Sequence, residues 1–268
     1  MPDLSSWETA VTDIAPGRIA YRGVPVSGLI EDADLAEAVW LVLFGRISSP
    51  GGVDALRRAL IAALDHGVTA PSTLATRATA STRGSLPLSI AAGLIAFAGP
   101  SHGGAAEEAA ELFVRIADAP GDLADTAAEH LDAELVAGRR IPGYGHPYHD
   151  RDPRVPALMN GIEARRTYRD IAVAVEAVIL QRTGKPLYMN ADAAVGALLL
   201  DAGLAAAEVT LVTALGRAIG LAAHAREERF GERPFRAPSL DSVHYVEPPT
   251  EGGEDPQNPD DDQDGNRR

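Results

Sequence analysis

The chain has 268 residues, enough to bury a sizeable core in one or two domains, and it contains no cysteine, which excludes disulfides, thiolate metal ligands and a cysteine nucleophile. Its formal net charge is −14; seven acidic residues and two arginines follow from Glu251 on, so −5 of that charge belongs to this stretch and −9 to the rest. An acidic body disfavours nucleic-acid binding, because arginine and lysine contacts to phosphate supply most of that affinity, so anionic ligands must be met by locally concentrated arginines.

The start of the chain, MPDLSSWETAVTD, lacks a basic segment followed by an apolar run, so we expect no signal peptide. The most apolar run, residues 86–98, is too short to cross a bilayer. We therefore expect a cytoplasmic protein that does not enter the membrane.

Most of the chain carries the apolar spacing of amphipathic helices. Alternating apolar and polar residues occur only in residues 14–26, where they predict a short hairpin. The class is therefore all-α with a minor β element. Residues 69–85 are a Thr/Ser-rich stretch to which we assign no helix, and residues 248–268 are acidic, rich in Pro and Gly, and predicted to be disordered. Helical patterns cover residues 34–45, 53–64, 86–98, 105–117, 124–137, 156–182, 189–200 and 205–230.

The most unusual segment is residues 141–154, IPGYGHPYHDRDPR, which lies between two helical patterns. The glycines beside Tyr144 allow a close approach to the backbone, and the three prolines forbid a continuous helix. His146 can change charge near neutral pH, and Arg154 offers a forked donor suited to a carboxylate. A solvated polar loop would explain the composition too. We favour a loop that closes on a small anionic substrate and on a bulkier group lying against its backbone.

Four polar residues interrupt apolar helical patterns beside Gly- or Pro-containing breaks, namely His66, His102, His146 and Asp192. In GPSHGG, the neighbours of His102 have little or no side chain, which leaves room for a ligand. In MNADAAVG, Asp192 stands among small and apolar residues, where burial would raise its pKa. A helix-capping aspartate remains the alternative for Asp192. A structural role is expected for the remaining candidates, His130, His224 and His244.

The motifs GPSHGG, IPGYGH with DPR, LYMNADAAVG and ALGRAIG, in this order, resemble those of the citrate synthase superfamily. The segments GRIAYRGVPVSGLI and WLVLFG are similar to its N-terminal signature, and the similarity runs over residues 12–249. In length and termini the chain looks like the citryl-CoA lyase module at the end of ATP-citrate lyase.

The resemblance implies three catalytic residues. Asp192 would remove the α-proton of acetyl-CoA, and His102 would donate a hydrogen bond to the thioester oxygen. His146 would polarise and protonate the ketone of oxaloacetate. This division is chemically reasonable, because a carboxylate alone cannot remove so weakly acidic a proton unless a donor stabilises the developing oxyanion.

The resemblance also implies binding residues. His66, Arg154 and Arg217 would hold substrate carboxylates, and Arg233 would reach across from the second subunit of a homodimer. Coenzyme A would enter as the acyl-CoA substrate, and no metal is expected. The adenine of coenzyme A would lie against the backbone of Ile141, Gly143, Tyr144 and Gly145, and Lys185 would meet a CoA phosphate.

The implied fold is a two-domain helical fold with a small N-terminal β-hairpin. Residues 1–103 and 204–247 would form a large helical domain, and residues 104–203 a small one, with the active site between them. Pro147 stands where the family often has arginine, and a second histidine, His149, follows; these departures leave the identity of the acyl-CoA open.

Three functions remain at this stage. We favour an enzyme that makes or cleaves citryl-CoA, with acyl-CoA and oxaloacetate or citryl-CoA as its partners. A true citrate or 2-methylcitrate synthase, which also hydrolyses the thioester, is the alternative. A non-catalytic partner subunit is the third. Sequence alone does not decide the direction of the reaction or which 2-oxo acid is used.

Overall fold

A computed structural model describes residues 7–45, 48, 51–163 and 165–247. The chain divides into two units, Met1–Phe235 and Arg236–Arg268. In the second unit, the described residues form one 3-10 turn, Leu240–Ser242, and the Ser239 side chain accepts a hydrogen bond from the Asp241 amide. The tail predicted to be disordered, residues 248–268, lies outside the described residues.

The first unit begins with a small antiparallel sheet. Its strands β1 (Thr12–Ala15), β2 (Arg18–Tyr21) and β3 (Val24–Pro25) pair in this order. The predicted hairpin is therefore confirmed, and a short third strand extends it. Helix α1 (Val26–Asp32), which the sequence analysis did not predict, follows directly.

The remainder of the first unit is helical, which confirms the all-α class. Most predicted helices agree with the observed ones to within a few residues. For example, the predicted end at Gly45 is a left-handed C-cap with φ of 62°, and Asp34 and Glu37 form a capping box at the start of the same helix. The helices are α2 (Leu35–Phe44), α3 (Gly52–Ala63), α4 (Pro71–Ser81), α5 (Leu86–Phe97), α6 (Gly104–Asp118), α7 (Leu123–Val136), α8 (Val155–Met159), α9 (Thr167–Thr183), α10 (Ala191–Asp201) and α11 (Ala206–Gly231).

Helix α4 lies in the Thr/Ser-rich stretch to which no helix was assigned. Serine and threonine have low helix propensity, so no local pattern predicted this helix. Pro71 starts the helix, and α4 packs against α5 and α11. Ser72, Thr73 and Thr76 are fully buried in these contacts. Packing against two helices outweighs the weak propensity, as is common for helices in globular proteins.

Helix α10 is central to the first unit. Asp192 is partly buried and all its other residues are buried, and the helix packs against α3, α6, α8 and α9. At its end, the buried Asp201 carboxylate accepts hydrogen bonds from the Tyr168 amide and from Arg169 Nε, which fixes α10 to the start of α9. The start of α10, where Asp192 lies, is thereby held on a rigid support.

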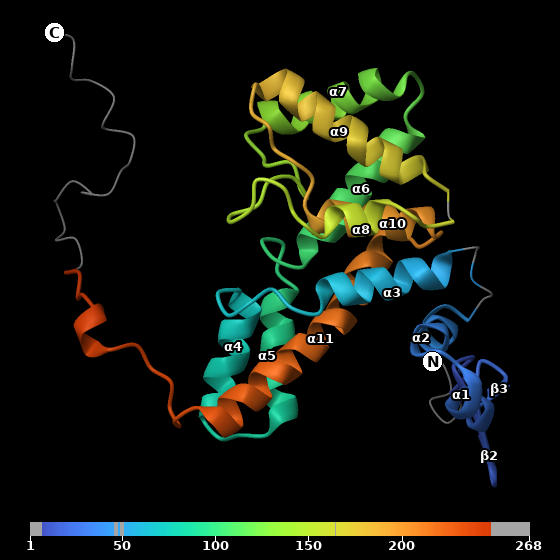
Figure 1. Cartoon of the computed structure of the whole chain (residues 1–268), viewed down its shortest axis with the longest axis vertical. Coiled ribbons are helices and arrows are strands. Elements are labelled where there is room, and N and C mark those ends of the chain that lie inside the picture. Colours follow the sequence, from blue (N-terminus) through green and yellow to red (C-terminus); the bar gives the residue numbers. More distant parts are fainter. Residues whose placement is uncertain (1–6, 46–47, 49–50, 164, 248–268) are drawn as a thin grey trace, which may run out of the picture. The chain divides into compact units, whose positions relative to one another are not determined.

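Helix α11 packs against α3, α4, α5 and α6, and Figure 1 shows it running beside α4 and α5. A Cβ at Gly220 would lie 1.8 Å from the Leu64 carbonyl oxygen, and one at Gly216 would lie 2.6 Å from that of Leu60. These two glycines therefore let α11 lie directly against the end of α3. By length and composition alone α11 could cross a membrane, but here it packs against four helices of one folded unit.

The predicted small domain, residues 104–203, covers α6 to α10. In Figure 1 these helices lie on one side of α3, and α4, α5 and α11 lie on the other. The boundary between a large and a small domain stays a prediction.

Candidate active site

One polar cavity of about 600 Å³ brings together residues from four places in the first unit. His66 comes from the loop between α3 and α4, and His102 from the turn between α5 and α6. His146 and Arg154 come from the loop that ends in α8, and Asp192 from the first turn of α10. The structure therefore places all three predicted catalytic residues, and two of the four predicted carboxylate ligands, around one space.

His102 is held by a serine from α4. The Ser72 hydroxyl oxygen lies 2.8 Å from His102 Nε2 and accepts a hydrogen bond of 3.2 Å from Arg217 Nε. Arg217 can only donate, so the Ser72 hydroxyl still has a hydrogen and a second lone pair for His102 Nε2, and both neutral tautomers of His102 fit this contact. Burial, with a contribution from the Arg217 charge, lowers the pKa of His102. His102 is therefore a neutral donor, suited to an oxygen that gains negative charge.

The tautomer of His146 is set by a backbone amide. The Tyr148 amide donates a hydrogen bond of 3.1 Å to His146 Nδ1, so the ring proton is on Nε2. Burial lowers the pKa of His146; Asp152 opposes this effect, whereas His149 and Arg154 reinforce it. The His149 ring lies 4.6 Å from the His146 ring, so the second histidine of this loop also lines the cavity.

Asp152 orients Arg154. Its two carboxylate oxygens accept hydrogen bonds of 2.9 Å from Arg154 Nε and 2.7 Å from Nη2, and further ones from the amides of Arg154 and Ala191. Burial alone would raise the pKa of Asp152, but these donors and the Arg154 charge outweigh it and lower the pKa to about 2. Asp152 is thus a permanent anion that ties the loop to the start of α10.

Asp192 has a different environment. Burial, partly opposed by the Arg154 charge and reinforced by Asp152, raises the pKa of Asp192 to about 6. Among the described residues, no donor makes a hydrogen bond to the Asp192 carboxylate, although its amide is capped by the Asn190 side chain. A carboxyl group with this pKa can both take up and release a proton near neutral pH.

His66 lies deeper against the wall formed by His102 and Phe97. Its ring is 5.4 Å from the ring of His102. Burial, followed by the charges of Arg217, His102 and Arg154, lowers the pKa of His66 to about 4, and Asp65 opposes the shift only in part. His66 is therefore a neutral hydrogen-bonding group at neutral pH.

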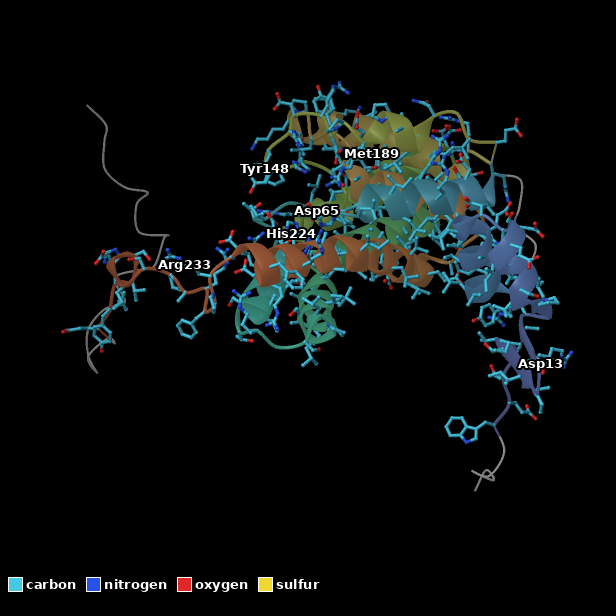
Figure 2. The ribbon with its side chains drawn as sticks, turned by 60° about the horizontal axis from the view of Figure 1, so that its bottom comes forward. Asp13, Asp65, Tyr148, Met189, His224 and Arg233 are labelled. Carbon is cyan, nitrogen blue, oxygen red and sulfur yellow. The ribbon has the colours of Figure 1, made fainter. Side chains whose placement is uncertain are left out.

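The predicted CoA loop, residues 141–145, and three further predicted binding residues do not line the cavity. Arg217 is fully buried behind it and donates hydrogen bonds to Asp65, Ser72 and Thr73, so it supports the wall instead of forming its surface. Lys185 is exposed in the segment after α9, and Arg233 is exposed just beyond α11, as Figure 2 shows for Arg233. Contacts of these residues with a ligand stay predictions.

The predicted CoA loop, residues 141–145, is fixed against the start of α10. Ile141 is buried, and the Tyr144 hydroxyl donates a hydrogen bond of 2.7 Å to the Ala172 carbonyl. Gly143 has φ of +83°, and a Cβ there would lie 2.5 Å from that of Ala193, so only glycine fits. The Gly143 carbonyl and the Gly145 amide pair with the backbone of residues 188–190. The loop is therefore preformed, and its contact with coenzyme A stays a prediction.

Sequence reasoning missed three supporting residues, Asp152, Asp65 and Ser72. Asp152 stands two residues before Arg154 in DPR, and this spacing was a signal that the two side chains could pair. Asp65 precedes His66 directly, which was a weaker signal. Ser72 lies in the stretch where no helix was assigned, so nothing in the sequence connected it with His102.

The fold and cavity thus define an all-α protein with an acid–base site made of imidazoles, carboxyl groups and arginine. A family model described as "Citrate synthase, C-terminal domain" matches residues 48–237. The chain belongs to the citrate synthase family.

Individual relatives agree with this assignment. A citrate synthase of Saccharolobus solfataricus is 34% identical over 199 residues, which are 70% of this chain and 51% of the relative, so the chain spans about half the length of the curated relatives it matches. The citryl-CoA lyase structure from Hydrogenobacter thermophilus superposes with a TM-score of 0.79 at 30% identity, covering 94% of this chain and 98% of that chain.

A third similar protein was solved with ligands. Citrate synthase from Thermoplasma acidophilum, in a ternary complex with carboxymethyl coenzyme A and oxaloacetate, superposes with a TM-score of 0.66 at 29% identity. The superposition covers 81% of this chain and 58% of that chain.

Proposed function

We propose that this protein makes or cleaves the carbon–carbon bond between the acetyl group of acetyl-CoA and oxaloacetate, as a citryl-CoA lyase. The observation that carries the proposal is the shared cavity. It combines an aspartate with a pKa of about 6 and two histidines whose lowered pKa values keep them neutral near pH 7. The similarity over nearly the full length of a citryl-CoA lyase supports it.

In the condensation direction, the Asp192 carboxylate removes a methyl proton of acetyl-CoA while His102 donates a hydrogen bond to the thioester oxygen. The resulting enolate, stabilised by the His102 hydrogen bond, attacks the ketone carbon of oxaloacetate, and the ketone oxygen takes a proton from His146 to become a hydroxyl group. In cleavage, His146 takes the hydroxyl proton, and the carbon–carbon bond breaks with its electron pair passing to the acetyl-CoA enolate held by His102. Protonated Asp192 then returns its proton to the methylene carbon. Each positioned acid or base supplies about 10²–10⁴-fold, so the reaction needs the convergent set.

Substrate carboxylates would be met first by Arg154 and His66, which line the cavity. Asp152 holds one edge of the Arg154 guanidinium, so this arginine is oriented before a ligand arrives. Arg217 would act indirectly, by supporting the residues that form the cavity wall, and Arg233 would come from a second subunit. Coenzyme A would lie along residues 141–145 with its phosphates near Lys185.

We propose that the protein acts as a homodimer in the cytoplasm. Exposed apolar side chains on α5 and α11 support the dimer, among them Leu88, Ile95 and Ile219, which are 64%, 79% and 58% exposed. Burying such side chains between two copies would be favourable.

Incubation of the purified protein with citryl-CoA, with separate measurement of acetyl-CoA and free CoA thiol, tests the proposal. A lyase produces acetyl-CoA and oxaloacetate without free thiol. Thiol release from acetyl-CoA and oxaloacetate would show a citrate synthase, and thiol release with propionyl-CoA a 2-methylcitrate synthase. If no reaction occurs in either direction, the hypothesis of a non-catalytic partner subunit remains.

A further inference from the structure

We propose that His224, on α11, is a positioning residue for the carboxylate-binding side of the cavity and that it acts through Asp65. The inference rests on the proposed function, in which the residue next to Asp65, His66, binds a substrate carboxylate. His224 does not line the cavity, and its sequence context gave it only a structural role.

The Asp65 carboxylate is a point where three donors converge. Its Oδ1 accepts hydrogen bonds of 2.7 Å from Arg217 Nη1 and 3.0 Å from His224 Nε2, and its Oδ2 accepts one of 2.9 Å from the Gly67 amide. Arg217 and His224 are seven residues apart, about two turns, and so lie on the same face of α11. Figure 2 shows Asp65 and His224 next to each other. Two residues of one rigid helix therefore fix the loop that carries His66.

The Asp65 carboxylate also connects His224 to α4. Arg217 Nη1 donates to Asp65, and Arg217 Nε donates a hydrogen bond of 3.2 Å to Ser72 on α4. Helix α4 carries Ser72, which contacts both His102 and Arg217. These hydrogen bonds connect the His66 loop, α11 and α4, and His224 joins them at Asp65, so a change at His224 reaches His66 without touching a ligand.

The backbone near His224 is held independently of the side chain. Gly220 packs against the Leu64 carbonyl, and the fully buried Arg217 keeps its own bonds to α4. Removal of the imidazole should therefore leave the fold in place and change only how Asp65 and the following residue are oriented.

Two variants and a control separate these effects. His224→Leu keeps a bulky side chain but removes the donor, whereas His224→Gln retains an N–H near the position of Nε2. The control is His130→Ala, which removes another partly buried histidine; within the described part of the chain its ring is bonded only to the Thr126 carbonyl on α7. Steady-state kinetics with oxaloacetate and acetyl-CoA, and with citryl-CoA, would be measured for all three.

For His224→Leu we expect the KM for oxaloacetate or citryl-CoA to rise about tenfold, with kcat and the KM for acetyl-CoA within about twofold of wild type. His224→Gln should restore most of the affinity, and the control should not change it. An unchanged KM in His224→Leu, or a Gln variant as impaired as the Leu variant, would overturn the inference.

Hydrogen–deuterium exchange of residues 64–70 provides a readout that does not depend on activity. The Gly67 amide donates to Asp65, so it should exchange faster in His224→Leu and at the wild-type rate in His224→Gln. If wild-type protein neither makes nor cleaves citryl-CoA, the proposed function fails, and this exchange still decides whether His224 positions Asp65. Unchanged exchange in the Leu variant would refute the positioning role.

Discussion

The two sides of the cavity are built in different ways. One, which we term the helical side, consists of His66 and His102 backed by α4 and α11, and its supporting groups Ser72 and Arg217 are fully buried. The other, the loop side, consists of residues 146–154 and the start of α10. Its Tyr148 is 71% exposed and reaches the helical side through a hydrogen bond of 3.3 Å from its hydroxyl to Thr69.

The difference indicates a division of labour. On the helical side, Ser72 and the buried Arg217 set the direction of the His102 imidazole, and a change there would misplace a bound ligand. On the loop side, Asp152 sets the direction of the Arg154 cation and is itself bonded to the start of α10. Asp152 and Asp192 on this side show that the environment, not the residue type, decides the role, because many donors hold one pKa at about 2 and burial raises the other to about 6.

The largest effect is expected from removing one catalytic group on each side. We expect His102→Ala and Asp192→Asn each to lower kcat by at least about 10³-fold, since each removes a donor or base that acts on the same proton transfer. Citryl-CoA cleavage followed through oxaloacetate, with circular dichroism to establish the fold, measures this. Wild-type turnover in both variants would contradict the assigned roles.

Next in size is the effect of Arg154→Ala, which removes the oriented cation of the loop side. We expect a loss of about 10²-fold in kcat/KM for the carboxylate substrate, because the charge-assisted bidentate contact between Arg154 and a substrate carboxylate is lost. The KM for acetyl-CoA should change little. Kinetics with each substrate varied in turn therefore distinguish a loss of carboxylate binding from a loss that affects both substrates. An equal loss for both substrates would show that Arg154 only supports the loop.

A smaller change tests the residue expected from a partner subunit. Arg233→Ala should raise the KM for oxaloacetate or citryl-CoA about tenfold or more, because Arg233 would meet a substrate carboxylate across the dimer. Analytical ultracentrifugation should show the same dimer for wild type and variant. No change in KM would show that the site is not shared.

The two aspartates should affect stability in opposite directions. The pKa of Asp192 is raised in the folded state, so proton binding by Asp192 favours folding. This stabilisation is full below about pH 4 and is lost as the pH rises through about 6. The pKa of Asp152 is lowered, so its contribution is present above about pH 4 and is lost as the pH falls toward 2.

At pH 7, Asp192→Asn should therefore stabilise the fold by about 2–3 kcal/mol, and Asp152→Asn should destabilise it by about 2 kcal/mol. Urea unfolding at pH 4 and pH 7 measures both, and the gain from Asp192→Asn should shrink at the lower pH. Destabilisation by both variants at pH 7 would contradict the contrast between the two carboxyl groups.

Sequence reasoning predicted the loop side better than the helical side. The composition of residues 141–154 and the position of Asp192 at the start of an apolar helix marked the loop side, and the hairpin and most helices followed from periodicity. Helix α4 was not predicted because its stability comes from packing against α5 and α11, which no local pattern encodes. For the same reason, neither the role of Ser72 nor the buried position of Arg217 was predicted.

The most direct test is a crystal structure of this protein with carboxymethyl coenzyme A and oxaloacetate. We predict that the carboxymethyl group lies between His102 and Asp192, with the ketone oxygen of oxaloacetate within hydrogen-bond distance of His146 Nε2 and a carboxylate on Arg154. Ligands bound elsewhere, or an oxaloacetate ketone that touches neither His146 nor Arg154, would contradict it.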